Sequence, residues 1–244
     1  MAPATDPAMQ PALLIVSHGS PSEPEPQEEA MRVLGRAVAK HLPGWRVEGT
    51  TLAAEGCFEA AVARLGKPVV YPFFMSEGWF TNTFLARKTA DLGLRQVEPF
   101  GIDPALPSCA VAEIKAVLRD KGWASQDTAL LLAAHGSGRS KTSADAPRAF
   151  ARTLEAAIPF REVATGFVEQ EPFLVDAARD LGQALCLSFF ALRSGHVEGD
   201  LPEAFAEAGF AGPVLPPFIE WEEVPELIAR GILRQRYASE AVMS

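Results

Sequence analysis

Short apolar runs alternate along the chain with segments in which apolar residues recur at helical spacing. The run at 12–17 (ALLIVS) has no polar alternation, which is typical of a strand buried on both faces of a parallel sheet. After a polar, proline-rich stretch, residues 30–42 place Met31, Leu34 and Val38 on one face of a helix. Strands that alternate with helices predict an α/β fold with parallel sheets and right-handed crossovers.

The same two patterns predict the remaining elements. Further strands are expected at 46–52, 69–74, 96–100, 128–134, 162–168, 184–190 and 213–215. Further helices are expected at 57–65, 84–92, 111–121, 149–157, 174–181, 200–208 and 224–236. In the helix at 200–208, Asp200 is expected as the N-cap, with Glu203 as its capping-box partner and Gly209 at the end.

The pattern restarts halfway along the chain, which indicates an internal duplication. His18 and His135 are 135 − 18 = 117 residues apart, and the octapeptides that contain them, LLIVSHGS and LLLAAHGS, match at five of eight positions. Solenoid repeats have periods of only about 20–50 residues, so a repeat of this length is a duplicated domain. We expect an amino-terminal domain over 1–123 and a carboxy-terminal domain over 124–244.

Composition and charge exclude several classes of protein. With 48% hydrophobic and 22% charged residues, the chain is globular rather than disordered. No apolar run approaches the ~18–20 residues of a membrane helix. The excess of 31 Asp and Glu over 22 Lys and Arg argues against a nucleic-acid partner. Three cysteines without a CxxC motif, and no secretory signal at the start, indicate a reduced, cytoplasmic compartment.

Histidines follow two strands of the second half. His135 comes directly after the strand at 128–134, and His196 follows the strand at 184–190. The carboxyl ends of parallel strands share one edge of a sheet, so the two imidazoles are a candidate pair for Fe²⁺, Co²⁺, Ni²⁺ or Zn²⁺. Glu169, at the end of another strand, would add a carboxylate and leave positions open for a substrate. A turn histidine bonded to its own loop, and a solvated carboxylate, are the structural alternatives.

Three motifs follow successive strands of the second half: HGS at 135–137, FVE at 167–169 and GHVEGDLPEA at 195–204. Their order resembles the class II tetrapyrrole chelatases of the CbiX/SirB type, and the resemblance spans nearly the whole chain. It implies two tandem flavodoxin-like domains, each with a mainly four-stranded parallel sheet flanked by helices. These domains would be related by pseudo-two-fold symmetry and would face each other across a cleft.

The resemblance also implies an activity. Members of the family insert Co²⁺ or Fe²⁺, and sometimes Ni²⁺, into sirohydrochlorin or a related tetrapyrrole with carboxylate side chains, for cobalamin or siroheme biosynthesis. The metal is a substrate, and no organic cofactor is expected. Because both domains lie in one chain, dimerisation is not required and a monomer suffices.

By this resemblance, His135 and His196 would hold the metal or accept protons from the pyrrole nitrogens, and Glu169 would assist. Imidazole suits either role because it changes protonation near neutral pH. A closed four-ligand site would retain the metal, whereas incomplete ligation lets it leave. The substrate carboxylates need donors. The candidates that flank the motifs are Ser137, Arg139 and Arg193, and ordinary surface charge is the alternative for the two arginines.

The first half lacks most of these residues. At an offset of 117, Trp79 stands where the second half has His196, and no carboxylate stands opposite Glu169. Only His18 is retained, either as a remnant turn residue or as a second contributor to substrate binding. We therefore expect a degenerate metal site in the first half and the active site in the second.

Aromatic residues replace the missing ligands in the first half. Trp79, Phe80 and Phe84 are candidates to stack on a flat macrocycle, with burial in the core as the alternative. A non-catalytic protein that binds metal or tetrapyrrole is the competing function. Phosphoryl transfer from histidine is disfavoured because no arginine precedes His18 or His135. Nucleotide binding is disfavoured because no GxGxxG or GxxxxGK[ST] motif follows a strand.

Overall fold

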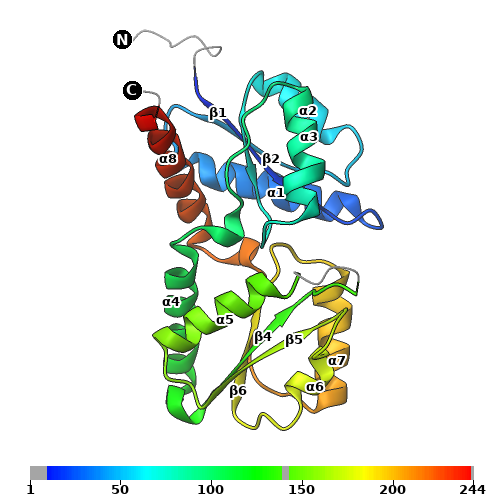
Figure 1. Cartoon of the computed structure of the whole chain (residues 1–244), viewed down its shortest axis with the longest axis vertical. Coiled ribbons are helices and arrows are strands. Elements are labelled where there is room, and N and C mark those ends of the chain that lie inside the picture. The colour runs from blue at the N-terminus through cyan, green and yellow to red at the C-terminus, as the bar shows by residue number, and fades with distance from the viewer. Residues whose placement is uncertain (1–9, 139–142, 243–244) are drawn as a thin grey trace. The chain divides into compact units, whose positions relative to one another are not determined.

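The computed structural model describes residues 10–138 and 143–242, which form two parallel sheets flanked by helices (Figure 1). The α/β fold expected from the sequence is therefore confirmed. By its contacts the chain divides into unit 1, which comprises Met1–Asp103 and Glu222–Ser244, and unit 2, which comprises Pro104–Trp221. Among the described residues, no helix has both the length and the apolar character needed to cross a membrane.

Unit 1 contains a three-stranded parallel sheet in the order β2-β1-β3. Its strands are β1 (Ala12–Ser17), β2 (Arg46–Thr51) and β3 (Val69–Pro72). The central strand β1 is buried along its whole length, as its unbroken apolar run predicts. In the register of the sheet, Leu13 pairs with Val47 on one side and with Val69 on the other.

The strand expected at 96–100 does not form in the described part of unit 1, so the expectation of four strands is wrong there. Gln96 makes a single isolated bridge to Val70. Pro99 lacks the amide hydrogen that would extend the ladder, and the chain turns into a 3-10 helix at Phe100–Ile102. The sheet of unit 1 therefore ends in one bridge at this edge.

Besides the 3-10 helix at Phe100–Ile102, the described part of unit 1 has five helical segments. They are α1 (Pro24–Ala39), α2 (Cys57–Leu65), a π-helix (Phe80–Leu85), α3 (Ala86–Asp91) and α8 (Val224–Val242). Helix α2 has the bounds that its apolar spacing predicts. Helix α1 begins at Pro24 instead of residue 30, because the first turn of a helix accommodates a proline, whose missing amide hydrogen would have no helical partner there.

Unit 2 contains a four-stranded parallel sheet in the order β5-β4-β6-β7, as expected. Its strands are β4 (Ala129–Ala134), β5 (Glu162–Phe167), β6 (Ala184–Ser188) and β7 (Val214–Leu215). Strand β4 lies in the interior of the sheet and is buried throughout, like β1 in unit 1. A core of small and large apolar side chains, including Leu131, Cys186 and Phe205, covers one face of the sheet.

Unit 2 also has five principal helical segments. They are α4 (Leu106–Lys121), α5 (Asp145–Ala157), α6 (Leu174–Ala178), a π-helix (His196–Asp200) and α7 (Leu201–Ala208). The capping box expected at Asp200 and Glu203 is wrong. Asp200 has helical dihedral angles (φ −64°, ψ −38°) and makes no capping hydrogen bond, because the helical backbone already begins with the π-helix. Gly209 ends α7 with a φ of +71°, as expected.

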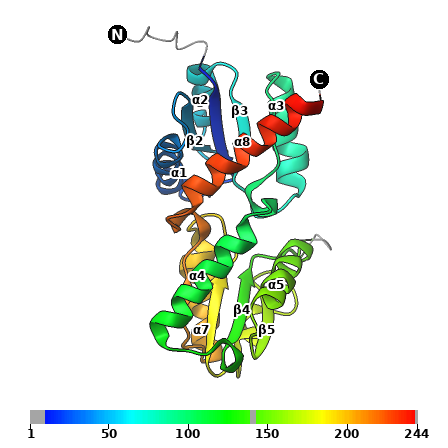
Figure 2. The same ribbon diagram turned by 90° about the vertical axis from the view of Figure 1, so that its left-hand side faces the viewer.

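The last helix of each half packs in the other unit. Helix α4 is the last helix of the first half but contacts α5 of unit 2, and α8 is the last helix of the second half but contacts α1 of unit 1 (Figure 2). The compact units therefore differ from the expected division at residues 123 and 124. Both helices bury apolar side chains, among them Ile114 in α4 and Ile232 in α8, so each unit needs the helix supplied by the other half.

Candidate functional site

The backbone around His135 forms a tight turn at the end of β4. The amide of Glu169, just after β5, donates to the carbonyl oxygen of His135 at 2.9 Å and ties the two strand ends together. Gly136 follows with a φ of +71°. A Cβ atom at Gly136 would lie 2.6 Å from the side chain of Gln170, so this turn requires glycine. The turn formed by His135 and Gly136 therefore places the imidazole at the edge of the sheet.

His196 is the first residue of the π-helix that leads into α7. Its Nδ1 atom lies 2.5 Å from Oδ2 of Asp200, four residues further on. The sequence reasoning assigned Asp200 to a helix cap and missed this contact. The signal that could have found it is the spacing of four residues in GHVEGD, because residues four apart are neighbours on a helix.

The structure brings His135 and His196 into direct contact, although they are 61 residues apart in sequence. Their Nε2 atoms are 2.8 Å apart, and the rings meet edge to face with centroids 4.2 Å apart. On the other side of each ring, Nδ1 faces an oxygen acceptor, the carbonyl of Gly136 at 2.9 Å for His135 and Asp200 for His196. Because each of these oxygens accepts a hydrogen bond, the ring hydrogen lies on Nδ1 in both histidines. The lone pairs of the two Nε2 atoms therefore face each other. Two lone pairs that face each other are suited to bind one cation between them.

Glu169 lies beside this pair but not within it. Its Oε2 atom is 3.8 Å from Nδ1 of His135, the ring nitrogen opposite the one that faces His196. Among the described residues there is no group of three or more histidine, cysteine, aspartate or glutamate side chains arranged to hold a metal. The expected set of two histidines and one carboxylate is therefore not assembled, because the carboxylate approaches His135 from the Nδ1 side.

The candidate donors for substrate carboxylates have different surroundings. The amide of Ser137 donates to Oε1 of Gln170 at 2.8 Å, and the hydroxyl of Ser143 donates to the same oxygen at 2.6 Å. Gln170, which sequence reasoning missed, therefore ties the loop after His135 to the end of β5. Arg139 lies outside the described residues.

Arg193 makes a two-pronged ion pair with Glu220. Its Nε and Nη2 atoms donate to the two carboxylate oxygens at 2.7 and 2.8 Å. The hydrogen bonds to Glu220 raise the pKa of the Arg193 guanidinium above its usual value. The structure therefore presents Arg193 as a paired cation, whereas the sequence suggested an open donor.

Unit 1 repeats the turn but not the ligands. His18 follows β1, its Nδ1 atom faces the carbonyl oxygen of Gly19 at 2.7 Å, and its own carbonyl oxygen accepts from the amide of Ala53 at 2.9 Å. Ala53 thus occupies the place of Glu169. The ring of His18 meets Phe80 edge to face with centroids 4.1 Å apart, close to the geometry of the histidine pair in unit 2. A phenyl ring therefore takes the place of the second imidazole.

The structure corrects the alignment of the two π-helices. The amide of Asn82 bonds to the carbonyl oxygen of Gly78, and the amide of Glu198 bonds in the same way to Ser194, which is an offset of 198 − 82 = 116. The π-helices begin at Phe80 and at His196, again 116 apart. Trp79 is therefore not the counterpart of His196, as the offset of 117 suggested. The offset between the halves is 116 residues here, one fewer than between His18 and His135, and it places Phe80 opposite His196 and Phe84 opposite Asp200.

Three aromatic side chains form an exposed cluster on unit 1. Trp79 is 62% exposed, Phe80 40% and Phe84 41%. Their ring centroids lie 5.0, 5.8 and 6.2 Å apart, and His18 adjoins the cluster through Phe80. The alternative that these residues fill the core is wrong. A cluster of exposed aromatic side chains is a candidate binding surface.

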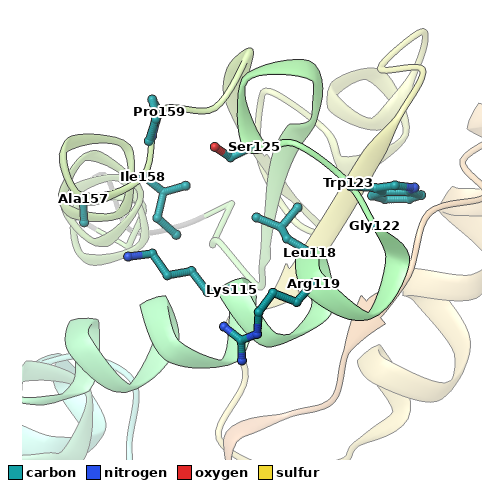
Figure 3. A pocket seen from close by; sticks show the side chains of 9 residues that line it. All are labelled: Lys115, Leu118, Arg119, Gly122, Trp123, Ser125, Ala157, Ile158 and Pro159. Atoms are coloured by element: carbon teal, nitrogen blue, oxygen red, sulfur yellow. The ribbon is translucent and has the colours of Figure 1, made fainter.

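A separate cavity of about 400 Å³ lies in unit 2 between α4 and the end of α5 (Figure 3). It is lined in part by Ser125, which precedes β4, so it lies near the edge of the sheet opposite His135. In Figure 3, Lys115 extends toward Ala157 at the end of α5, whereas Arg119 points away from that helix. Its two cationic groups do not converge on one point, so the strand-end histidines remain the candidate site.

Comparisons with known proteins agree with this choice. Residues 129–222 match the family model CbiX. The match begins at the first residue of β4 and contains both His135 and His196. No curated protein gives a match.

Three of the similar solved structures, each matching more than nine-tenths of the chain, are the following. CbiX, the terminal enzyme for biosynthesis of siroheme in denitrifying bacteria, is 42% identical with a TM-score of 0.82, over 91% of this chain and 98% of that chain. SirB from Bacillus subtilis with Fe³⁺ is 19% identical with a TM-score of 0.69, over 96% and 98% of the two chains. The sirohydrochlorin chelatase SirB from Bacillus subtilis subspecies spizizenii in complex with cobalt is 18% identical with a TM-score of 0.62, over 95% and 96%. The two SirB structures support the fold alone.

Proposed function

Since the chain belongs to the CbiX family, we propose that it inserts Co²⁺ or Fe²⁺ into sirohydrochlorin or a closely related tetrapyrrole. The observation that carries the proposal is the contact between His135 and His196, whose Nε2 atoms are 2.8 Å apart in the region that matches the family. Its 42% identical relative is the terminal enzyme of siroheme biosynthesis, and the SirB chelatases hold iron or cobalt. The same insertion reaction would serve cobalamin biosynthesis, and the same site would also accept Ni²⁺ as the metal.

The histidine pair would hold the incoming metal loosely. At a metal–nitrogen distance of about 2.0–2.1 Å, two ligands at about 90–110° lie about 2.8–3.4 Å apart. The present separation of 2.8 Å lies at the short end of this range, so the pair needs to widen by at most a few tenths of an ångström to take up the ion. Two ligands leave the remaining positions to water and to the macrocycle, so the ion can pass to the four ring nitrogens.

Insertion also releases two pyrrole protons, and the same residues would accept them one after the other and pass them to solvent. Once the metal has moved to the macrocycle, the Nε2 atoms of His135 and His196 are available as bases. Glu169, 3.8 Å from Nδ1 of His135, would stabilise the imidazolium that results. The exchange of two protons for one divalent ion involves no oxidation or reduction, so the proposal requires no organic cofactor.

Substrate binding is assigned to residues of both units. The exposed cluster of Trp79, Phe80 and Phe84, with His18 beside it, suits the face of a flat macrocycle. The carboxylate side chains of the substrate would be met by the hydroxyl of Ser137 and by two arginines. These arginines are Arg139 and Arg193, and the latter would exchange Glu220 for a substrate carboxylate.

The proposal also covers the setting in which the protein acts. One chain supplies both units, which supports action as a monomer. The net charge of −9 is consistent with a small-molecule substrate and with no role for nucleic acid or a membrane surface. We place the activity in the cytoplasm, where reducing conditions keep iron in the Fe²⁺ state.

The test is anaerobic insertion of Co²⁺ or Fe²⁺ into sirohydrochlorin, followed by the change in the visible spectrum of the macrocycle. The wild-type chain should turn over, and His135→Ala and His196→Ala should each lose at least tenfold in rate. His41→Ala is the matched control, because His41 is an exposed histidine at the end of α1, away from either strand-end turn. Binding of the macrocycle without turnover by the wild-type chain would refute the enzyme and favour the non-catalytic binding protein.

A further inference from the structure

The π-helix at His196–Asp200 joins a candidate metal ligand to a carboxylate. Nδ1 of His196 and Oδ2 of Asp200 lie 2.5 Å apart, and the Asp200 side chain is half exposed. Asp200 performs no capping function, since no backbone amide at the start of α7 bonds to its side chain. Among the described residues, His196 is the only hydrogen-bond partner of the Asp200 carboxylate. The contact therefore has no role in beginning the helix.

We propose that Asp200 is a positioning residue that fixes the tautomer and the orientation of His196. An ionised carboxylate can only accept hydrogen bonds, so it holds the hydrogen on Nδ1 and leaves the lone pair on Nε2, which faces His135. His135 is oriented in the same way by the carbonyl oxygen of Gly136. The backbone supplies that acceptor whatever the side chains are, whereas the acceptor for His196 depends on Asp200.

Unit 1 provides an independent observation. Its π-helix survives with Phe80 in the place of His196 and Phe84 in the place of Asp200. The unit that lacks the histidine also lacks the carboxylate, and the backbone turn persists without either. The shape of the turn therefore does not require Asp200, which leaves its contact with His196 as the function that the structure assigns to it.

The consequence for metal binding follows from the chemistry of imidazole. Without the carboxylate, neutral His196 can place its hydrogen on Nε2, and the lone pair then points away from His135. The ring can also rotate, so both ligands are no longer held at one point before the metal arrives. Loss of a group that orients a metal-binding histidine typically weakens metal affinity by about 10–100-fold.

The experiment uses the full chain and the variants Asp200→Ala, Asp200→Asn and Asp200→Glu. Glu198→Gln is the matched control, because it removes an exposed carboxylate from the same turn, and among the described residues no hydrogen bond or ion pair joins its side chain to His196. Three quantities are measured: the Co²⁺ dissociation constant from visible absorption without tetrapyrrole, kcat and KM for insertion, and the His196 tautomer from ¹⁵N NMR. Circular dichroism checks that each variant is folded.

We expect Asp200→Ala to weaken Co²⁺ binding by 10–100-fold, to lower kcat with KM for sirohydrochlorin nearly unchanged, and to shift His196 toward the Nε2–H tautomer. If the alanine variant fails to fold, Asp200→Asn provides the test. Its amide can either accept from Nδ1 or donate to it, so the Nδ1–H tautomer of His196 should be lost in part. Asp200→Glu should recover part of the affinity, and Glu198→Gln should behave like the wild type. An unchanged tautomer and Co²⁺ affinity in folded Asp200→Ala would overturn the positioning role.

The positioning role rests on the proposed function, but the two fail in different ways. If the wild-type chain binds no Co²⁺ and inserts none, the proposed function fails, and the tautomer of His196 in Asp200→Ala still decides the role of Asp200. If His196→Ala abolishes Co²⁺ binding while Asp200→Ala leaves it intact, the proposed function stands and the positioning role fails.

Discussion

The equivalence of the two π-helices predicts that a second metal site can be restored in unit 1. Phe80 meets His18 with centroids 4.1 Å apart, against 4.2 Å for His196 and His135. Replacing Phe80→His would place an imidazole beside His18 in the arrangement of unit 2. Replacing Phe84→Asp would add a carboxylate at the position equivalent to Asp200.

The expected magnitudes follow from exposure and from the chemistry of the natural pair. Phe80 and Phe84 are 40% and 41% exposed, so the two substitutions together should cost about 2–3 kcal/mol of folding free energy, which the chain should tolerate. The double variant should bind a second Co²⁺ within about tenfold of the affinity of the natural site. Phe80→His alone should bind it about 10–100-fold more weakly, because the new imidazole lacks the carboxylate that orients it.

The assay is a Co²⁺ titration by visible absorption and calorimetry, without tetrapyrrole. The stoichiometry should rise from one ion per wild-type chain to two in the double variant. Adding His135→Ala to the double variant should remove the natural site and leave one ion, bound in unit 1. A stoichiometry of one in a double variant that is folded by circular dichroism would refute the equivalence of the two turns.

Three further predictions concern substrate binding, the units and thiol chemistry. Trp79→Ala should raise KM for sirohydrochlorin about 2- to 12-fold at constant kcat, because an aromatic stacking contact contributes about 0.5–1.5 kcal/mol. An unchanged KM would show that Trp79 does not contact the substrate. Ile232→Ala in α8 should cost about 2–5 kcal/mol and speed amide exchange in β1–β3; faster exchange confined to β4–β7 would contradict the packing of α8 in unit 1. Burial raises the pKa of the Cys186 thiol, so this thiol stays protonated at pH 8–9. It should therefore react with a thiol reagent only on unfolding, whereas half-buried Cys57 should react first. Equal reaction rates of Cys57 and Cys186 in the folded protein would refute this.

Much of the fold can be predicted from the sequence, because the apolar runs of the strands and the helical spacing of apolar residues in the helices are uninterrupted. The buried strand at Ala12–Ser17 and the helix at Cys57–Leu65 have the expected bounds. The start of α1 at Pro24 was missed because proline in an acidic segment is equally typical of a loop. The sequence does not predict that α4 packs in unit 2 and α8 in unit 1, because an apolar helix face does not specify which sheet it covers.

The candidate site could be predicted in part, because its residues follow predicted strands. That His135 and His196 meet follows from the shared edge of parallel strands. Asp200 was assigned to a capping box because the sequence pattern of a cap and that of a histidine contact coincide at this position, and only the backbone angles distinguish them. The side on which Glu169 approaches His135 depends on side-chain torsions, and the register of the π-helices depends on a one-residue slip. Neither leaves a signal in a single sequence.

The central claim is that His135 and His196 together hold the metal that the protein inserts. X-ray absorption at the cobalt edge, on the full chain loaded with one equivalent of Co²⁺ before sirohydrochlorin is added, tests it most directly. We expect two imidazole nitrogens in the cobalt shell of the wild-type chain, and loss of that signal in both His135→Ala and His196→Ala. A cobalt shell without imidazole, or one unchanged in these variants, would contradict it.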